Sequence, residues 1–383
     1  MWELLKNKVF LHATAVLTGT MVGVGIFSIP LSFTKSGFFI GLILLFVIGA
    51  ITILYNLIFA EIILRTQSSH QLVGYTRRYL RSPWARRIVF FANALGIYGA
   101  LLVYIHYAGG FLDNLLSEFF FIPRQYYSLG FFLLVSSILP FGFRTVAGIE
   151  FFITALFIIV TLSIFGVGIQ NIDVANLTTV DVSYWFLPYG VLLFAFAGLS
   201  SIPLQRRLLH GQEHNFKRSI VFAVVLSGIL YALFALTVVG VSGFSTSDDA
   251  LSGLREFVGP PLILLASFFG ICTITTSFLM LASALSDIFY LDFRIRRKSS
   301  WLLTVIPPLV LYLSGLRSVV DIISLVGAVG IGTEVIILLF IFRKAKKEGD
   351  RTPEFSMSIP NWVSILLGIV FMIGIVFALF VRD

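Results

Sequence analysis

The sequence predicts an all-α membrane protein whose helices cross the bilayer many times. Of its 383 residues, 58% are hydrophobic and only 12% are charged, whereas soluble domains carry roughly 25% charged residues. Apolar runs long enough to cross ~30 Å of hydrocarbon recur along the whole chain. The hydrophilic stretches between these runs are too short to form a soluble catalytic domain. The single cysteine, Cys272, excludes an intramolecular disulfide.

Eleven apolar runs are predicted to be membrane-spanning helices. They cover residues 9–33, 37–64, 88–112, 127–142, 148–169, 184–209, 218–241, 260–289, 300–314, 319–342 and 359–381. The first run is too long for a signal peptide and lacks a small-residue cleavage site, so we expect it to be retained. Between the second and third runs, residues 65–87 are expected to form a short helix on the inner membrane surface.

The distribution of Lys and Arg predicts the orientation of these segments. With the N-terminus inside, 22 of the 27 Lys and Arg residues fall on the inner side. The outer side keeps the other five: Lys35, Arg124, Arg255, Arg317 and Arg382. Because cytoplasmic loops carry the excess of basic residues, we predict a multi-pass protein of the cell membrane with a cytoplasmic N-terminus and an outside C-terminus. The basic residues are therefore topological, and no nucleic-acid partner is expected.

The first segment contains an irregular patch, "GTMVGVGIFSIP", at residues 19–30. Three glycines and a proline interrupt the run where the bilayer tolerates unsatisfied backbone least. Non-helical backbone at membrane depth occurs only where it is buried in protein or lines a wet cavity. The patch therefore predicts a broken helix whose freed N–H and C=O groups are available to a ligand.

The sixth segment contains a matching patch, "VLLFAFAGLSSIP", at residues 191–203. The two patches lie five segments apart, and because five is odd the two helices cross the membrane in opposite directions. Matched irregular segments of this kind are typical of an inverted repeat whose discontinuous helices meet at the bilayer midplane.

These two patches also carry a resemblance to a known family. "TGTMVGVGIFSIP" resembles the first-helix G-x-G-I-F motif of the amino acid/polyamine/organocation superfamily. "FAFAGLSS" resembles its sixth-helix F-A-F-x-G-F motif, with Leu199 in place of the last aromatic residue. Eleven segments and an outside C-terminus are most similar to the amino acid/auxin permease branch and to bacterial aromatic amino acid permeases. The resemblance implies a LeuT-type fold with one five-helix repeat at 1–169, an inverted repeat at 170–342, and an inner loop with a peripheral eleventh helix at 343–383.

The predicted breaks offer donors and acceptors for an amino acid headgroup. The outer half of the first segment begins near Gly23, Val24 and Gly25, whose amides lie at the positive end of a helix dipole and suit a carboxylate. The outer half of the sixth segment ends near Phe194, Ala195 and Ala197, whose carbonyls suit an ammonium group. Close packing of helices through small residues is the alternative explanation for these glycines.

A pocket for the substrate side chain is expected beside the breaks. Small and apolar residues of the third segment face it, and aromatic residues of the broken segments add to its wall. The predicted lining residues are Asn93, Gly96, Ile97, Phe27, Phe196 and Gly198. Since no Asp or Arg is placed to recognise a charged side chain, a neutral substrate of medium to large size is favoured.

The eighth segment contains a candidate sodium site in "TITTS", residues 273–277. Resemblance to LeuT-type sodium sites implies coordination by the carbonyls of Gly19, Val22 and Thr273 and by the hydroxyls of Thr276 and Ser277. Neutral oxygens of this kind are suitable for Na⁺. The alternative is that the hydroxyls bond back to carbonyls of their own helix.

Three ionisable groups inside segments are candidates for proton coupling, because charge at membrane depth is costly and usually functional. Glu334 is the deepest. Glu61, toward the inner end of the second segment, could instead reach the inner surface. His106, near the outer end of the third, could be an interfacial residue.

We therefore predict a monomeric symporter of neutral, apolar or aromatic L-amino acids, driven by a Na⁺ or H⁺ gradient through alternating access. Its partners are the substrate and the lipid bilayer, and it needs no cofactor other than Na⁺ as a coupling ion. The alternatives are an exchanger or uniporter without a driving ion and a membrane sensor that binds an amino acid without transport. No enzyme motif is present in the sequence, so an enzyme is not expected.

Overall fold

The structure is a computed structural model that describes residues 7–380 apart from residues 69, 142–145 and 317. Within these residues the regular structure is helical. Gly37 and Val180 form an isolated antiparallel β-bridge. Lys6, Arg144, Arg317 and Arg382, which belong to the predicted charge asymmetry, lie outside the described residues, as do the ends of the predicted segments 127–142 and 359–381.

The α-helices follow the predicted order. In the first half of the chain they are α2 (Lys8–Met21), α3 (Gly25–Ser36), α4 (Phe38–Leu64), α5 (Leu72–Tyr79), α6 (Pro83–Leu116), α7 (Arg124–Ile138) and α8 (Val146–Gly168). In the second half they are α9 (Val174–Thr178), α10 (Leu187–Ala195), α11 (Ile202–Leu208), α12 (Phe216–Ser242), α13 (Arg255–Val258), α14 (Pro260–Asp287), α15 (Arg297–Leu313), α16 (Val319–Val326), α17 (Gly332–Glu348) and α18 (Asn361–Phe380). The π-helical turns Ile288–Asp292 (η8) and Gly327–Ile331 (η9) follow α14 and α16.

Most of the predicted segments are long and apolar enough in the structure to cross a membrane. These spans are Phe38–Leu64, Pro83–Leu116, Leu187–Leu208, Glu213–Ser245, Pro260–Tyr290, Val319–Glu348 and Asn361–Phe380, together with the pair α2 and α3, which is bent by 51°. The predicted runs at 127–142, 148–169 and 300–314 correspond to α7, α8 and α15. The predicted surface helix between the second and third segments is α5.

Helix α6 begins earlier than the hydropathy pattern predicts, at Pro83 instead of residue 88. The side chain of Ser82 accepts a hydrogen bond from the amide of Ala85 and so caps the helix. Proline is favoured in the first turn because its fixed φ suits a helix and its missing N–H is not needed there. Capping chemistry, not hydrophobicity, sets this boundary.

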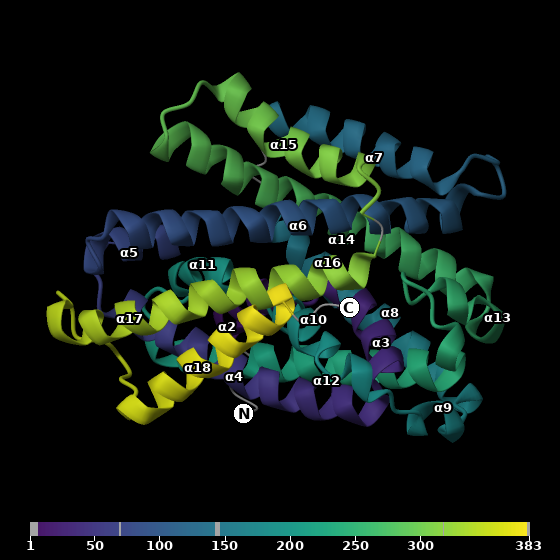
Figure 1. Cartoon of the computed structure of the whole chain (residues 1–383), viewed down its shortest axis with the longest axis horizontal. Coiled ribbons are helices and arrows are strands. Elements are labelled where there is room, and N and C mark those ends of the chain that lie inside the picture. The colour runs from purple at the N-terminus through teal and green to yellow at the C-terminus, as the bar shows by residue number, and fades with distance from the viewer. Residues whose placement is uncertain (1–6, 69, 142–145, 317, 381–383) are drawn as a thin grey trace.

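The loops predicted on the inner side meet at one end of the bundle. In Figure 1 the long helices run roughly along the horizontal, with α5 and the end of α17 on the left and α9 and α13 on the right. At the left end, Arg78 pairs with Asp350 at 2.8 Å, and Arg206 donates to the carbonyl of Ile63 at 3.0 Å. These contacts join the second, sixth and tenth segments, as the alternating topology requires.

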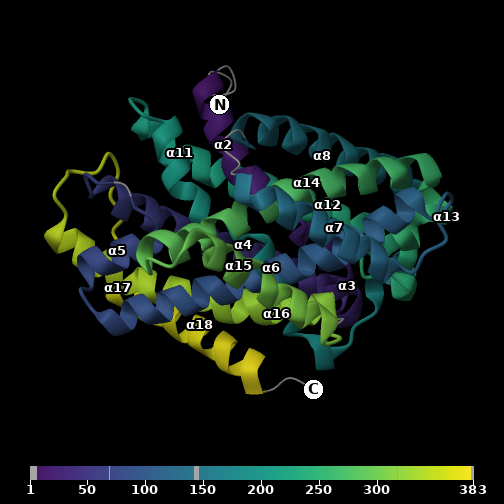
Figure 2. The ribbon, with the colours of Figure 1, turned by 90° about the horizontal axis from the view of Figure 1, so that it is seen from above.

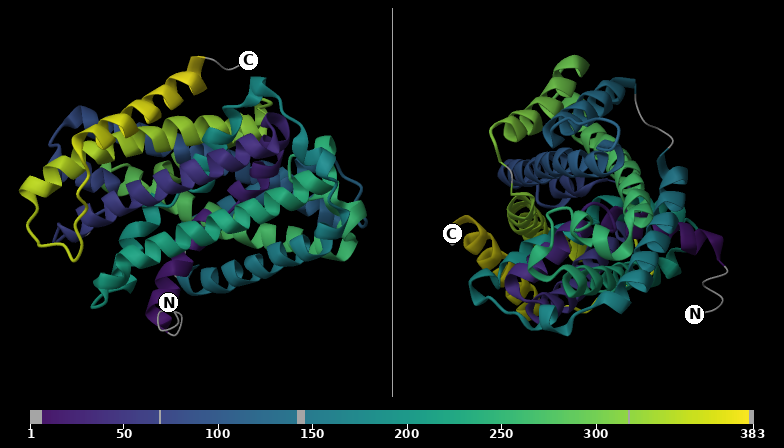
Figure 3. Two further views of the ribbon diagram at one scale, coloured as in Figure 1. Left: turned by 90° about the horizontal axis from the view of Figure 1, so that it is seen from below. Right: turned by 90° about the vertical axis from the view of Figure 1, so that its right-hand side faces the viewer.

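The broken helices lie in the middle of the bundle. Helix α10 packs against α3, α4 and α16, while α12 packs against α2, α3 and α4. Helices α7 and α15 cover α6 from one side, and α18 lies along the outside against α17 (Figures 1 and 3). The N-terminal end of α2 projects from the bundle beside α11 (Figure 2). The centre thus holds both predicted breaks.

Candidate functional site

The first break lies between Met21, where α2 ends, and Gly25, where α3 begins. The amides of Val22 and Gly23 donate to the carbonyls of Thr18 and Met21, both at 2.7 Å. Within the described part of the chain, no backbone carbonyl accepts from the amides of Val24 or Ile26. The sequence prediction of a break at Gly23–Gly25 is therefore confirmed, and free donors lie at the start of α3.

The second break follows Ala195, the last residue of α10. The amide of Ala197 donates to the carbonyl of Phe194 at 3.1 Å, and a short 3-10 turn at Leu199–Ser201 leads into α11. The predicted interruption near Phe194, Ala195 and Ala197 is therefore confirmed as well. The last carbonyls of α10 lie at the negative end of its dipole.

The two breaks touch each other directly at Gly25. A Cβ atom placed on Gly25 would lie 2.7 Å from the Cα atom of Ala195, whereas one on Gly23 would have only the carbonyl oxygen of Thr20 nearby, at 3.8 Å. A Cβ on Gly198 would lie 2.6 Å from the side chain of Leu17. Close packing therefore accounts for Gly25 and Gly198, while a Cβ atom on Gly23 would meet only an ordinary van der Waals contact.

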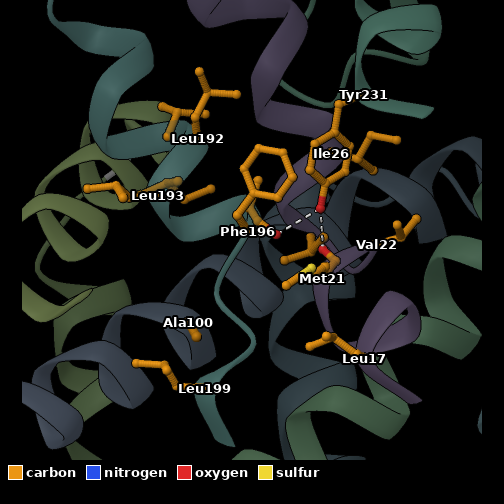
Figure 4. Close-up of a cluster of buried hydrophobic side chains, with 14 of the residues drawn as sticks. Leu17, Met21, Val22, Ile26, Ala100, Leu192, Leu193, Phe196, Leu199 and Tyr231 are labelled. Carbon is orange, nitrogen blue, oxygen red and sulfur yellow. Dashed lines mark hydrogen bonds between the residues drawn. The ribbon is translucent and has the colours of Figure 1, made fainter. Parts of the chain in front are cut away.

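Tyr231 of α12 joins the two breaks. Its hydroxyl donates to the carbonyl of Met21 at 2.6 Å and to the carbonyl of Ala195 at 2.8 Å. Figure 4 shows this hydroxyl between the end of α2 at Met21 and the start of the second break at Phe196. No pattern in the sequence pointed to this residue, because it lies in a regular part of the seventh segment.

Phe196 is fully buried, and its ring contacts Tyr231 with 5.0 Å between ring centroids. Cβ atoms placed on Gly49 and Gly228 would lie 3.7 and 3.6 Å from the tip of that ring. The ring is therefore enclosed by α4 and α12. The backbone carbonyl of Phe196 lies 3.4 Å from the hydroxyl of Tyr55, which donates to it.

Phe27, the other aromatic residue predicted to line the pocket, lies in an aromatic cluster on the α3 side of the breaks. Its ring meets four others from α6, α8 and α12 at centroid distances of 4.8–6.0 Å. The members of this aromatic cluster are Phe27, Tyr107, Phe111, Phe157 and Phe234. Phe27 is only 2% exposed, so the cluster is part of the packed interior beside the breaks.

The structure brings together Asn93, predicted to line the pocket, and Glu334, predicted to couple protons. The Asn93 amide donates to a Glu334 carboxylate oxygen at 3.0 Å, and Glu334 is 7% exposed. Gly96 and Ile97 lie one turn further along α6, and no side chain fills the space at Gly96. Glu334 lies in the first turn of α17, which follows η9, and π-helical turns of this kind are frequent at functional sites.

The π-helical turn η9 also contacts the outer half of the sixth segment. A Cβ atom placed on Gly327 would lie 1.9 Å from the carbonyl oxygen of Gly190 in α10, and one on Gly190 would lie 2.0 Å from the carbonyl oxygen of Ser324. Only glycines allow backbones to approach this closely. Helix α10 is thereby tied to the segment that carries Glu334.

The residues of the candidate sodium site come from α2 and α14. The Thr276 hydroxyl donates to the carbonyl of Thr273 at 3.0 Å, as the back-bonding alternative expects. The buried Thr273 hydroxyl has no partner in the described structure. Gly19 and Val22 lie at the end of α2, which packs mainly against α12, α11 and α8, while α14 packs mainly against α6 and α8. All five predicted ligands are neutral oxygens, which suit Na⁺ chemically.

Glu61 and His106 have partners away from the breaks. Glu61 is fully buried, pairs with Arg65 at 2.8 Å and accepts from the amide of Met357 at 2.6 Å. His106 Nε2 donates to the carbonyl of Leu316 at 2.8 Å in the loop before α16. Glu61 thus anchors the loop that leads to α18 at the end of the bundle that carries α5, and His106 lies at the opposite end.

Comparisons with known proteins agree with this geometry. The profile of the tryptophan/tyrosine permease family matches residues 6–381. The chain is 26% identical over 323 residues to the tyrosine-specific transport system 1 of Haemophilus influenzae, a match that covers 78% of each chain. The crystal structure of MhsT in complex with L-phenylalanine superposes with a TM-score of 0.61 at 15% identity, covering 97% of this chain and 98% of MhsT.

These relatives settle the class of the protein. The similarity to MhsT confirms the predicted all-α LeuT-type membrane fold. The matched proteins are permeases and transport systems and not enzymes, which supports amino acid transport and confirms the predicted resemblance to aromatic amino acid permeases. Because the family profile spans almost the entire sequence, the protein belongs to the tryptophan/tyrosine permease family.

Proposed function

We propose that the protein is a symporter of neutral aromatic L-amino acids that works by alternating access. The observation that carries this proposal is the meeting of the two breaks at Gly25 and Ala195 in the middle of the bundle. The free amides at the start of α3 and the carbonyls at the end of α10 supply both kinds of group that an amino acid headgroup requires.

The headgroup would bind through backbone. The amides of Val24 and Ile26 are free to donate to the substrate carboxylate at the positive end of α3. Each carbonyl oxygen has two lone pairs, so the Ala195 carbonyl can accept from a substrate ammonium in addition to Tyr231.

The aromatic cluster around Phe27 supports an aromatic substrate. Aromatic rings pair favourably at centroid distances of about 4.5–7 Å, and the cluster lies beside the breaks. The names of the tyrosine-specific relative and of the MhsT complex with L-phenylalanine point to the same class. No charged side chain occurs in residues 22–24 or 196–201, which favours a neutral substrate.

Coupling to Na⁺ would use the carbonyls of Gly19, Val22 and Thr273 with the hydroxyls of Thr276 and Ser277. The orphaned hydroxyl of Thr273 supports a polar ligand near this part of α14. The alternative coupling group is Glu334, because a buried carboxyl whose hydrogen-bond partner among the described residues is Asn93 could take up and release a proton. The side of the bundle that carries α5 and α11 would face the cytoplasm.

Uptake into proteoliposomes tests the proposal. Labelled tyrosine, tryptophan, phenylalanine, lysine and glutamate would be compared with an inward Na⁺ gradient, an inward proton gradient and neither. We expect accumulation of the aromatic amino acids under one gradient and none of lysine or glutamate. Binding without uptake would favour a sensor, and uptake only against preloaded amino acid would favour an exchanger.

The double variant Thr276→Ala with Ser277→Ala separates the two coupling ions. If Na⁺ drives uptake, this variant should lose Na⁺ stimulation while it still binds substrate, because the hydroxyls lie on α14 and not at the breaks. If wild-type uptake ignores Na⁺ and follows the pH gradient, the sodium assignment fails.

A further inference from the structure

Tyr231 contacts the ends of two different half-helices. The carbonyl of Met21 ends α2, the inner half of the first segment, and the carbonyl of Ala195 ends α10, the outer half of the sixth. Both are C-terminal helix ends, where unpaired carbonyls carry partial negative charge. Two such ends converge on one neutral hydroxyl at 2.6 and 2.8 Å.

This arrangement is well enclosed. Tyr231 is 0% exposed, Phe196 packs against its ring, and Ala195 is 1% exposed. A buried carbonyl without a donor would be costly. The Met21 carbonyl also accepts from the Gly23 amide, but the Tyr231 hydroxyl is the donor that lies within hydrogen-bond distance of both carbonyls and so joins the two negative helix ends.

The same helix, α12, also holds the other end of α2. The Thr14 hydroxyl lies 3.0 Å from the Ser219 hydroxyl, and the Asn7 amide donates to Gln212, just before α12, at 2.6 Å. If α2 is to swing away and open the site to the inner side, its bonds to α12 must break. Of these contacts between α2 and α12, the one made by Tyr231 also includes the second break, through the carbonyl of Ala195.

We propose that Tyr231 is a positioning residue of the transport cycle, whose hydroxyl holds the end of α2 against the end of α10 and so keeps the inner half of the first segment closed. The transport cycle itself rests on the function proposed above, but the contact of Tyr231 with the two helix ends can be tested without any substrate.

The test measures how accessible α2 is. A single cysteine replaces Ala13, which is fully buried on α2 and makes no side-chain hydrogen bond, in a Cys272→Ala background that removes the native thiol. The rate at which a small polar maleimide labels this cysteine in detergent is compared between the protein with Tyr231 intact and the Tyr231→Phe variant. Because a lost hydrogen bond is worth about a tenfold change in an equilibrium, we expect labelling to be about tenfold faster in the variant.

Tyr79→Phe is the matched control. Tyr79 is also a buried tyrosine, but its hydroxyl lies 2.7 Å from that of Thr66 at the inner end and does not reach a break. Its labelling rate should equal that of the wild type. The proposal would be overturned if Tyr231→Phe and Tyr79→Phe were labelled at the same rate, whether that rate equals the wild-type rate or exceeds it.

A second variant covers the case in which Tyr231→Phe does not fold. Tyr231→4-aminophenylalanine keeps an N–H donor at nearly the same reach, so it should label at about the slow wild-type rate. Fast labelling in this variant, with a monodisperse protein, would refute the role of the donor. If the wild-type protein transports no amino acid, the proposed function is contradicted. The labelling result can still be interpreted, because it is measured without substrate.

Discussion

Gly23 and Gly25 lie two residues apart in the first break, yet their surroundings differ. A Cβ atom on Gly25 would clash with the backbone of Ala195, whereas one on Gly23 would meet only the Thr20 carbonyl oxygen at an ordinary van der Waals distance. At the residue scale, packing therefore requires glycine at one position and tolerates a methyl group at the other.

This difference predicts opposite behaviour of two alanine variants. In Gly25→Ala the new methyl group would overlap α10, and overpacking of this kind costs about 1–3 kcal/mol. We expect a lower thermal unfolding midpoint in detergent and weaker binding of aromatic amino acids. Gly23→Ala should unfold near the wild-type temperature. A Gly25→Ala protein as stable and active as Gly23→Ala would contradict the close approach of α3 and α10.

Glu334 and Asn93 form a second pair whose role can be tested at single residues. Glu334→Gln keeps the shape and a hydrogen-bonding group beside Asn93 but cannot exchange a proton. If Glu334 couples protons, uptake by this variant should lose its response to a pH gradient while counterflow exchange of labelled substrate persists. Asn93→Ala is the control, since it removes the partner and keeps the carboxyl. Unchanged pH-driven uptake in Glu334→Gln would remove Glu334 from the coupling mechanism.

At the scale of elements, α18 and the loop before it are attached to the bundle at both ends. The loop is held by Glu61, and Arg351 donates to the carbonyl of Leu64 at 3.1 Å. Near its other end, Gly374 of α18 lies against Tyr189 of α10. The eleventh helix lies along the outside of the bundle against α17 and touches one of the broken segments.

Removing the attachment at Glu61 should loosen α18 and the loop before it. Glu61→Ala leaves Arg65 and the Met357 amide without their partner, and breaking a buried pair costs about 3 kcal/mol. We expect a lower unfolding midpoint and faster proteolysis within residues 349–360. Glu354→Ala, which removes a partner of Arg351 whose side chain is 26% exposed, should change stability by less than about 1 kcal/mol. Equal proteolysis of both variants would show that Glu61 does not anchor the loop.

The helices and both breaks could be predicted from the sequence because they follow from local signals. Apolar length predicts spans, and clustered Gly and Pro predict interruptions. The partners of the breaks could not be predicted in this way. Tyr231 is 210 residues from Met21 along the chain, and Asn93 is 241 residues from Glu334, so no local pattern records these contacts. The π-helical turn at Gly327–Ile331 was also missed, because its glycines read equally well as ordinary small packing residues.

At the scale of the whole molecule, the loops that are predicted to be inner gather at one end and carry most of the basic residues. Arg65, Arg78, Arg206 and Arg351 all bond at this end. The prediction that this end is cytoplasmic follows from the positive-inside rule.

Reporter fusions in bacterial cells test the orientation. A green fluorescent protein at the N-terminus should fluoresce, because it folds in the cytoplasm. The same reporter fused to the C-terminus should stay dark, because it would be exported in unfolded form. Alkaline phosphatase fused to the C-terminus should be active. A fluorescent C-terminal fusion would show that both ends of the chain lie on the same side and would exclude an odd number of crossings.

The neutrality of the two breaks has an electrical consequence. Residues 22–24 and 196–201 carry no charged side chain, and an amino acid with a neutral side chain crosses as a zwitterion without net charge. In the proposed symport mechanism, the substrate then gives the membrane voltage no charge to act on, and the voltage acts through the coupling ion. One monovalent cation moving across 100 mV supplies about 2.3 kcal/mol, enough for a roughly 50-fold accumulation of substrate. The current measured during uptake would therefore count the coupling ions carried with each molecule, and simple exchange would produce no current.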